Sequence, residues 1–452
     1  MSGTDPLWWD GYAVRPPEPI GIPPRADVVI VGAGYTGLWT ALHLLRSDPS
    51  RQVLLLEARH VGFGASGRNG GWVSALWPVA PERIASRHGR DAALDQLAAL
   101  RETVDDVGSF CHDHAPEAGF AKGGTLLLAR SPAQVARARA YVEHSDAWGE
   151  GTTWLDAAEA RARLAAPDAL GATFNPHCAR IHPRALVEAL AREARALGAV
   201  IAECTPVAEI SSGSVRLTDG REVRAPAVLR ATEGWSARLP GSRRAVVPVY
   251  SLMVATAPLP AATWDRLGLR AREVFADHGH VVTYGQRTVD DRIAFGGRGA
   301  PYHWGSRIRP SYDHDEHVFA ALRRGLRTLL PELGDVGFTH AWGGPLGIAR
   351  DWHPSVAFDR ATGLGHAGGY VGDGVAATHL AGATLADLVL GRDSALTRLP
   401  WVGHRSPAWE PEPLRWAGVN AGLALARAAD AEERRTGKAA RTAYLLDRLT
   451  GG

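Results

Sequence analysis

Near the start of the chain, the apolar positions change from a continuous run to helical spacing and back again. Residues 28–31 are all apolar, which is typical of a strand that is buried on both faces. Residues 35–47 place apolar side chains three or four positions apart, which predicts a helix. Residues 53–56 are again all apolar. The order strand, helix, strand predicts a βαβ unit with parallel strands over residues 26–57.

Beyond this unit, the same periodicities predict further helices and strands. Pro183 opens a helix, because proline fits the first helical turn. Asp219-Gly220, between two alternating runs, predicts a hairpin. We expect helices at 81–115, 132–148, 183–197, 375–390 and 413–430, strands at 123–129, 200–204, 246–256, 281–284 and 292–296, and two segments at 342–348 and 366–372 that lead into the 375–390 helix.

Segments with the pattern of a nucleotide-binding domain recur in separated stretches of the chain, and long segments with a strand pattern lie between them. We therefore expect a discontinuous nucleotide-binding domain made of residues 26–90, 183–240 and 340–400, and an inserted sheet-rich substrate domain made of residues 91–182 and 241–339. Residues 1–25 form an extended lead-in, which Trp8, Trp9 and Tyr12 are expected to fix to the body, and residues 401–452 form a helical tail.

The first strand runs into Gly32, Gly34 and Gly37, which have the spacing G-x-G-x-x-G of a dinucleotide site. Gly32 makes the tight turn, Gly34 lets a pyrophosphate approach the backbone, and Gly37 lets the helix pack on the strand. Glu57 follows twenty residues later, at the end of the second strand. Its carboxylate can accept both ribose hydroxyls and would repel a 2′-phosphate, which argues against NADP.

Composition and charge narrow the class of protein. The 452 residues are 45% hydrophobic and 22% charged, with a net charge of +2, so no basic nucleic-acid footprint is present. Three separated cysteines indicate a reducing cytoplasm and no disulfide framework. No apolar run is long enough for a signal peptide or a membrane span. We expect a cytoplasmic monomer or homodimer.

Two further glycine-rich segments follow the βαβ unit in the sequence. Residues 61–72 form a glycine-rich loop in which Arg68 brings positive charge toward phosphate. Residues 368–375 read Gly-Gly-Tyr-Val-Gly-Asp-Gly-Val and lead directly into a helix, whose N-terminus can stabilise negative charge. We expect Asp373 to cap this helix through its side chain.

These three glycine segments, in this order, resemble the FAD-dependent D-amino-acid oxidase and sarcosine oxidase superfamily. The form Gly-Arg-Asn-Gly-Gly at 67–71 is most similar to the gamma-glutamylputrescine oxidoreductase branch, and the resemblance runs from about residue 27 to 391. It implies an α/β fold with a Rossmann-like FAD-binding domain of the glutathione-reductase type and an inserted α+β substrate domain on a mostly antiparallel sheet. It also implies noncovalent FAD, because Trp72 follows Gly71 and the cysteines lie elsewhere. The residues expected at FAD are Gly32, Gly34, Tyr35, Thr36, Gly37, Glu57, Ala58, Arg59, Gly64, Ala65, Ser66, Arg68, Asn69, Gly70, Gly71, Val207, Thr232, Gly234, Gly344, Gly369, Gly372, Asp373, Gly374 and Val375.

The resemblance further implies an amine or amino-acid substrate that gives a hydride to flavin N5. The resulting imine hydrolyses to a carbonyl compound and an amine. Arg298 could clamp an acidic group of the substrate, or it could be a solvated strand-end arginine. The other candidates for the catalytic site each have a plain packing alternative; they are Trp72, Tyr302, His303, His366 and Tyr370.

The electron acceptor stays open. Sarcosine oxidases have a lysine over the flavin that promotes the reaction with O₂, and here the only lysines are Lys122 and Lys438, away from the matching strand. The acceptor is thus O₂ or another molecule. Two alternatives are a flavin monooxygenase that uses NAD(P)H, and an FAD-binding electron-transfer subunit of a complex.

Overall fold

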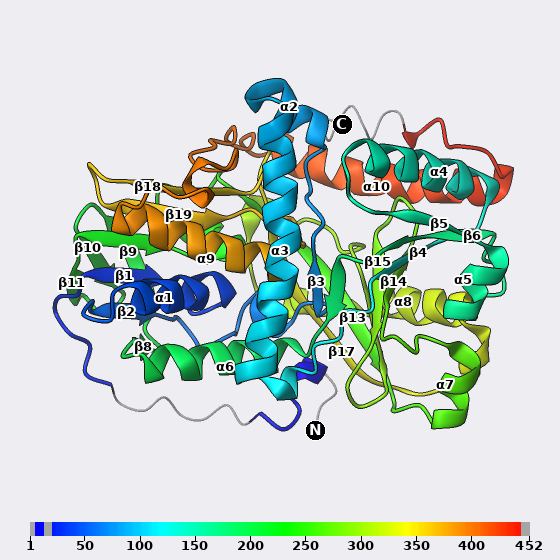
Figure 1. Ribbon diagram of the computed structural model, residues 1–452, viewed down its shortest axis with the longest axis horizontal. Coiled ribbons are helices and arrows are strands. Elements are labelled where there is room, and N and C mark those ends of the chain that lie inside the picture. The colour runs from blue at the N-terminus through cyan, green and yellow to red at the C-terminus, as the bar shows by residue number, and fades with distance from the viewer. Residues whose placement is uncertain (1–4, 13–19, 444–452) are drawn as a thin grey trace.

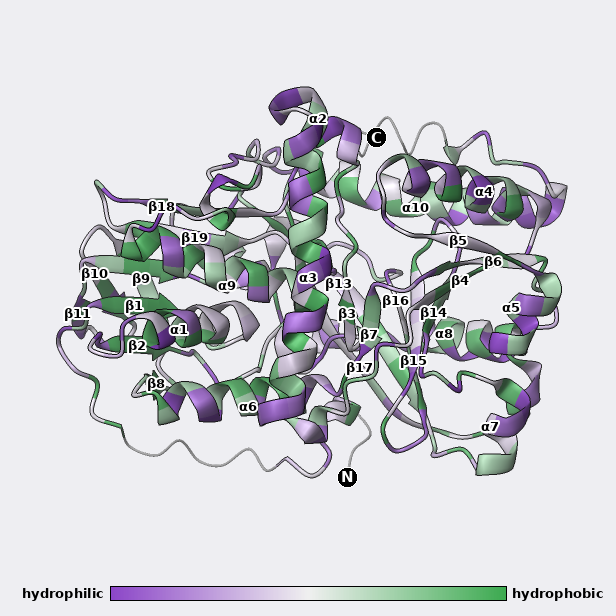
Figure 2. Cartoon of the chain, in the orientation of Figure 1, coloured by the Kyte–Doolittle hydropathy of each residue, from purple (hydrophilic) through white to green (hydrophobic). Residues whose placement is uncertain are grey.

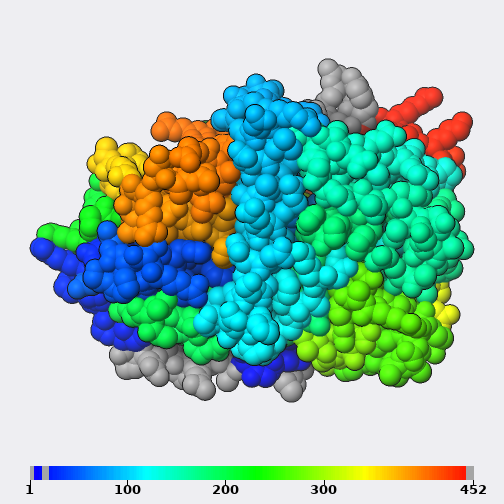
Figure 3. Space-filling model, in the orientation of Figure 1, coloured from blue at the N-terminus to red at the C-terminus, as the bar shows by residue number. Residues whose placement is uncertain are grey.

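The computed structural model describes residues 5–12 and 20–443. Strands of two large sheets stand side by side, and helix α3 (Arg90–His114) runs down the face between them (Figure 1). Figure 3 shows the same helix lying across the surface between the two halves. No helix among the described residues is long and apolar enough to cross a membrane.

The first sheet has six strands in the order β18-β19-β12-β1-β2-β8. All pairings are parallel except that of β18 with β19. Figure 2 shows hydrophobic residues along its central strands, as expected for strands with both faces covered. The bounds are β1 (Val28–Val31), β2 (Val53–Leu56), β8 (Val200–Ala202), β12 (Ala227–Arg230), β18 (Ser355–Asp359) and β19 (Leu364–Gly368).

Three helices pack together on this sheet. Gly37 and Gly382 lie where backbones approach closely: a Cβ on Gly37 would come 2.0 Å from the Gly32 oxygen, and one on Gly382 would come 2.6 Å from the Trp39 Cβ. The side chains of these three helices and of the strands form one continuous apolar core. The helices are α1 (Tyr35–Ser47), α6 (Pro183–Ala196) and α9 (Gly374–Leu390).

The second sheet has eight strands in the order β17-β13-β16-β15-β14-β4-β6-β5. Only the pairing of β14 with β4 is parallel. The strands are β4 (Thr125–Ala129), β5 (Thr153–Asp156), β6 (Gly171–Asn175), β13 (Val247–Thr256), β14 (Val274–Asp277), β15 (Thr283–Arg287), β16 (Ile293–Gly297) and β17 (Phe338–Ile348).

Two small sheets and the remaining helices complete the described part of the chain. The Asp219-Gly220 turn joins two antiparallel strands, as the sequence predicts. The small sheets are β9 (Val207–Ser211), β10 (Ser214–Leu217) with β11 (Glu222–Arg224), and β3 (Trp72–Ser74) with β7 (Cys178–Arg180). The helices are α2 (Pro81–His88), α4 (Pro132–Ala147), α5 (Ala157–Arg163), α7 (Ala261–Leu267), α8 (Glu316–Leu329) and α10 (Leu414–Thr436).

The predicted single helix over 81–115 is wrong in one respect, because Gly89 divides it into α2 and α3. Gly89 has a φ of 90°, a left-handed conformation that ends α2 and that other residues rarely adopt. The amphipathic helix α8 was not predicted from the sequence. It buries Phe319, Leu322 and Leu326 against the eight-stranded sheet.

Candidate functional site

The glycine turn between β1 and α1 has no room for side chains. Gly32 has a φ of 109°, and a Cβ there would lie 2.5 Å from the Ala231 oxygen. A Cβ on Gly34 would lie 2.8 Å from the Ser66 hydroxyl, which accepts a hydrogen bond from the backbone N–H of Tyr35 (2.8 Å). The N-terminus of α1 therefore lies against the glycine loop, and no side chain fits between them. Such exposed backbone N–H groups at a helix N-terminus are what a pyrophosphate site requires.

Glu57 lies at this turn, at the carboxyl end of β2. Its carboxylate accepts from the backbone N–H groups of Ala33 (3.0 Å) and Arg59 (2.9 Å). Burial raises the pKa of the Glu57 carboxyl, and these two amides oppose the rise. Both oxygens keep lone pairs for ribose hydroxyls. The segment leading to Val207 passes beside Glu57, since the Thr205 N–H donates to the Glu57 carbonyl (2.7 Å).

The glycine loop is held by three tryptophans from distant parts of the chain. Its three consecutive carbonyls at 67–69 each accept a hydrogen bond from an indole N–H. Trp8 and Trp342 are almost fully buried, and Trp8 and Trp9 come from the N-terminal lead-in. The described residues 5–12 of the lead-in are therefore fixed to the body through this loop, whereas residues 1–4 and 13–19 of the predicted lead-in lie outside the described residues. The bonds run from Trp9 to Gly67 (3.0 Å), from Trp342 to Arg68 (2.9 Å) and from Trp8 to Asn69 (2.8 Å).

Side chains of the loop hold it from within. The Asn69 amide donates to the Ala65 and Ser66 carbonyls and accepts from the Gly71 N–H (2.7 Å). Gln286 on β15 donates to the Gly70 carbonyl (2.7 Å). The loop conformation is thus determined by the protein itself.

Arg68 is engaged with protein groups. Its guanidinium pairs with Asp313 (2.8 Å), donates to the carbonyls of Phe63 (2.8 Å) and Gly343 (3.2 Å), and lies over the Trp9 ring. This links the loop to β17, where Gly344 packs against the Arg68 side chain. That Arg68 also contacts phosphate stays a prediction.

The entry of α9 brings Asp373 and Arg298 together. The Arg298 guanidinium, at the end of β16, donates to the Val371 carbonyl (2.5 Å) and lies 3.8 Å from the Asp373 carboxylate. A Cβ on Gly372 would meet this guanidinium at 2.5 Å. Burial raises the pKa of Asp373 to about 6, and the charge of Arg298 opposes the rise.

Asp373 is the N-cap residue of α9, as expected, but its side chain does not cap the helix. Asp373 has φ −97° and ψ 38° and makes no side-chain hydrogen bond to the helix. A capping side chain needs extended backbone at its own residue, and here the carboxylate turns toward Arg298 instead. The Asp373 side chain accepts no hydrogen bond from the first backbone N–H groups of α9. The helix begins with Gly374 and Val375.

A buried carboxylate that the sequence analysis missed lies between two predicted residues, Thr232 and Gly234. Glu233 accepts from the backbone N–H groups of Gly347 (3.2 Å) and Gly369 (2.9 Å). Burial raises its pKa to about 7, although these amides oppose the rise. It joins the end of β17 to the glycine segment before α9. Its place just after a buried apolar strand, between two residues expected at FAD, was the signal that the sequence offered.

Tyr284 on β15 is a second residue that the sequence analysis missed. Its ring occupies the space beside Gly70 and Gly296, where a Cβ on either glycine would come 2.6 Å from it. Its hydroxyl bonds to Ser251 (2.7 Å), and Trp72 packs edge-on against it with 6.1 Å between ring centres. Trp72 and Tyr284 thus form an aromatic wall where the glycine loop meets the second sheet.

The remaining substrate-side candidates are engaged elsewhere. The Tyr302 hydroxyl donates to Glu412 (2.8 Å), and His303 stacks on Tyr312. His366 lies 3.3 Å from the Ser355 hydroxyl within the first sheet. The Tyr370 hydroxyl bonds to Thr36 (3.0 Å) on α1. Of the predicted substrate residues, Arg298 and Tyr370 have side chains at the entry of α9; a Cβ on Gly374 would come 3.2 Å from the Tyr370 ring.

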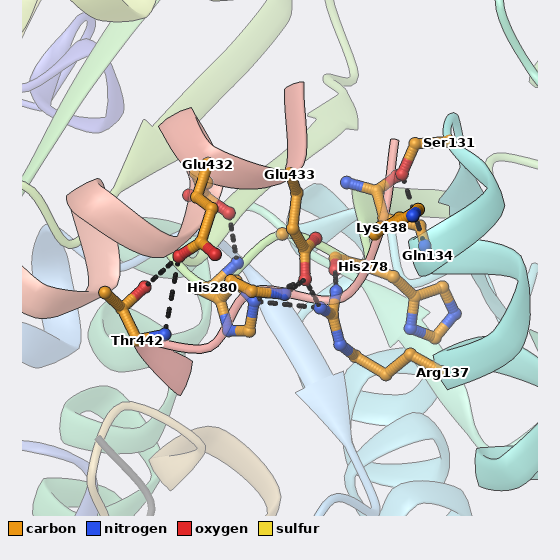
Figure 4. A network of polar contacts seen from close by, with 12 residues as sticks. Ser131, Gln134, Arg137, His278, His280, Glu432, Glu433, Lys438 and Thr442 are labelled. Atoms are coloured by element: carbon orange, nitrogen blue, oxygen red, sulfur yellow. Dashed lines mark hydrogen bonds and ion pairs between the residues drawn. The ribbon is translucent and has the colours of Figure 1, made fainter. Parts of the chain in front are cut away.

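A polar network fixes α10 to the second sheet (Figure 4). His280 lies 2.9 Å from the Glu433 carboxylate, which also pairs with Arg137 on α4 (2.5 Å). Asp430 accepts from the backbone N–H groups of His280 (2.8 Å) and Val281 (2.9 Å). These three ligand-type side chains lie close together, but the Arg137 guanidinium already supplies the positive charge that would balance the carboxylate. The network is structural.

Comparison with known proteins agrees with this geometry. The family model described as FAD dependent oxidoreductase (DAO) matches residues 27–388. A protein of Rhizobium meliloti described as probable oxidoreductase OrdL is 31% identical over 83% of this chain and 85% of its own length. Gamma-glutamylputrescine oxidoreductase of Escherichia coli is 28% identical over 83% of this chain and 86% of its own length. The crystal structure of glycine oxidase from Geobacillus kaustophilus has the same fold, with a TM-score of 0.70 and 24% identity over 85% of this chain and 100% of that one.

Proposed function

The chain belongs to the DAO family of FAD-dependent oxidoreductases, and from this premise we propose that it is an enzyme that oxidises a C–N bond of an amine or amino acid. Two relatives support this substrate class by name, the gamma-glutamylputrescine oxidoreductase and a glycine oxidase of Geobacillus kaustophilus that is 27% identical. When bound, FAD accepts a hydride from the carbon next to the substrate nitrogen, and the imine product hydrolyses to a carbonyl compound and an amine.

The observation that carries the proposal is the contact of Arg298 with the entry of α9. Negative charge develops on a flavin as it is reduced, and a helix N-terminus with an adjacent guanidinium stabilises such charge. Arg298 comes from the second sheet, whereas α9 belongs to the first. The redox end of the cofactor site therefore faces the second sheet, and we assign substrate binding to that side.

The remaining site residues suit the other end of FAD. Glu57 and Arg59 would hold the adenosine ribose, and the Gly32 turn with the α1 N-terminus would hold the pyrophosphate. The loop at 64–71 would lie along the ribityl chain and flavin. We propose noncovalent binding, since Trp72 is the residue that follows this loop.

Several finer predictions fit this proposal. The first sheet, with strands from three stretches of sequence, supports a Rossmann fold of the glutathione-reductase type, and the second sheet supports an inserted substrate domain at 91–182 and 241–339. The three free cysteines suit a cytoplasmic enzyme. We keep monomer or homodimer as the proposed state.

We propose slow reaction with O₂ and an electron acceptor other than O₂. Lys122 is exposed and pairs with Asp105 (2.5 Å), and Lys438 is exposed. Neither offers an ammonium group at the entry of α9, where Arg298 is the nearby cation.

Anaerobic reduction of the bound flavin tests the proposed function. Amines and amino acids are added one at a time to the oxidised holoenzyme, and the flavin absorbance is followed. Bleaching by an amine, with none by NADH or NADPH, is the expected result. Bleaching by NAD(P)H alone would favour a monooxygenase, and a flavin reduced by neither would favour an electron-transfer subunit; each result would overturn the proposal.

A further inference from the structure

Six arginines line a cavity of about 630 Å³ between the 3₁₀ turn Glu233–Arg238, the segment 305–309 and the start of α10. Glu412 is the single acidic residue of the lining, and it pairs with Arg415 (3.1 Å). None of the other five arginines pairs with a carboxylate in the part of the chain that the structure describes. The cavity therefore carries positive charge that the surrounding protein does not balance. The six are Arg238, Arg243, Arg244, Arg307, Arg309 and Arg415.

The five arginines without a carboxylate are all exposed, and their N–H groups are largely free to bind a ligand. Arg244 donates one hydrogen bond to the Trp409 carbonyl. The guanidinium groups of Arg243 and Arg307 have no partner within residues 5–12 and 20–443. A guanidinium can donate two parallel hydrogen bonds to the oxygens of a phosphate group. The cavity is therefore suited to a ligand that presents several phosphates.

Large apolar side chains stand exposed beside this cavity. Trp304 and Trp416 are 49% and 43% exposed, and their ring centres lie 6.4 Å apart. Leu414 is 63% exposed, more than any other large hydrophobic residue in the described part of the chain. Residues 416–426 of α10 carry no charge, although several of them are exposed. Apolar groups that gather in this way at a surface mark a site of interaction.

Glu412 joins the apolar group to the basic cavity. Its carboxylate accepts from the backbone N–H groups of Gly305 (2.8 Å) and Trp416 (2.9 Å), and from the Tyr302 hydroxyl (2.8 Å). The turn that carries Trp304 is thereby held against the first turn of α10. The two features form one surface, which we call the docking surface. It comprises Arg238, Arg243, Arg244, Arg307 and Arg309 with Trp304, Leu414 and Trp416.

We propose that the docking surface binds the surface of an anionic lipid bilayer. The arginines bind the phosphates of the lipid headgroups, and the tryptophans and Leu414 enter the boundary between headgroups and acyl chains, where tryptophan is favoured. The protein then lies on the membrane without spanning it. The proposal depends on neither the substrate nor the electron acceptor.

The separation of charged and apolar groups favours a bilayer over other anionic partners. Trp304, Leu414 and Trp416 lie outside the lining of the basic cavity. A protein interface has its apolar residues at the centre and its polar residues at the rim, whereas a phospholipid joins a charged headgroup to a separate apolar part. A free anion would match the arginines alone and leave the tryptophans exposed.

Co-sedimentation of the full-length, FAD-loaded protein with lipid vesicles tests the proposal. Vesicles of phosphatidylcholine are compared with vesicles of equal parts phosphatidylcholine and phosphatidylglycerol, at low and at high salt. The protein is expected to bind the vesicles that contain phosphatidylglycerol and to bind the neutral ones much more weakly. Salt should weaken the binding, because ions screen exposed charges.

Substitutions on the docking surface should lower the partition coefficient onto the anionic vesicles. Arg243→Gln and Arg307→Gln should each lower it about fivefold, because a basic residue at an anionic membrane contributes about 1 kcal/mol and 1.4 kcal/mol is a factor of ten. The double change Trp304→Ser with Trp416→Ser should lower it about tenfold. The loss from the tryptophans should persist at high salt, since apolar insertion is not screened.

Matched controls change the same residue types elsewhere on the surface. Arg270 and Arg324 are exposed and, among the described residues, have no side-chain partner, so their replacement by Gln should leave vesicle binding within twofold of wild type. Leu170→Ser and Val289→Ser remove exposed apolar side chains away from the docking surface and should do the same. All variants are expected to keep the thermal midpoint and FAD content of the wild type.

Several results would overturn the proposal while amine oxidation stands. One is equal binding to neutral and anionic vesicles, and another is binding that the docking-surface variants and the controls change equally. Binding of poly-L-glutamate without binding of vesicles would assign the surface to an acidic protein instead. A dimer in sedimentation that the tryptophan substitutions dissociate would assign it to a second copy of the chain.

Discussion

Replacement of Trp8 by phenylalanine tests whether the N-terminal lead-in organises the cofactor loop. Trp8 is 1% exposed, and its indole N–H donates to the Asn69 carbonyl at 2.8 Å. Phenylalanine keeps an aromatic ring but removes the donor, which leaves that carbonyl without its indole partner. A buried acceptor that loses its partner costs about 1–3 kcal/mol.

Part of this cost appears in FAD affinity, because the loop must take the same conformation in order to bind. If all of it does, the dissociation constant rises between about fivefold and about a hundredfold, since 1.4 kcal/mol corresponds to a factor of ten. The assay is quenching of FAD fluorescence on titration with apoprotein, together with the thermal midpoint with and without FAD. Trp342→Phe, which removes the bond to Arg68, should act in the same direction.

Trp264→Phe is the matched control. Trp264 is 3% exposed and donates to the Asp291 carbonyl at 3.2 Å, but it lies in the core of the second sheet. Its replacement should lower the free energy of unfolding without changing FAD affinity. Suppose that Trp8→Phe and Trp264→Phe lower the free energy of unfolding equally and that both leave the FAD dissociation constant within twofold of wild type. Trp8 would then only fill space in the core, and the idea that it organises the cofactor loop would be refuted.

Three further predictions follow from the same geometry. Gly37→Ala should destabilise the fold by about 3 kcal/mol and abolish FAD retention, because its Cβ would lie 2.0 Å from the Gly32 oxygen. Gly325→Ala, in the interior of α8 with open space around it, should retain FAD and raise stability by up to about 1 kcal/mol, because alanine is the better helix former. Equal behaviour of the two variants in thermal melts would contradict the packing argument. In the apoprotein, Asp373 keeps its proton between pH 3.8 and about 6, whereas the unfolded chain has lost it, so the free energy of unfolding should fall as the pH rises through that window. Asp373→Asn should remove up to about 3 kcal/mol of this change, measured by denaturant titration at several pH values. A variant with the same pH profile as the wild type would refute the assigned pKa. Amine-reduced enzyme should reoxidise much more slowly in air-saturated buffer than with an added artificial dye, and fast peroxide formation would contradict the argument from the two lysines.

The parts of the fold that could be predicted from the sequence depend on local patterns. The βαβ unit was predicted correctly because an apolar run, a helical stripe and the glycine turn all lie within thirty residues. Gly89 was the visible signal for the break between α2 and α3, since glycine is the residue that tolerates its left-handed conformation. Phe319, Leu322 and Leu326 have the spacing of one face of a helix, so the signal for α8 was also present in the sequence.

The support of the site could not be predicted, because it depends on contacts between distant residues. Trp342 and Arg68 are 274 positions apart and meet only through the register of β17 against β13. Asp373 is a reasonable helix cap by residue type, but the approach of Arg298 from another sheet decides where its carboxylate points. A single sequence carries no information about that approach.

A single-turnover experiment tests the central claim most directly. Oxidised holoenzyme is mixed anaerobically with an excess of an amine that reduces it, the mixture is quenched, and the carbonyl product is measured against the FAD released by acid. Oxidation of a C–N bond predicts one carbonyl product for each FAD reduced. Flavin reduction without a carbonyl product, or a protein from which acid releases no FAD, would contradict the account.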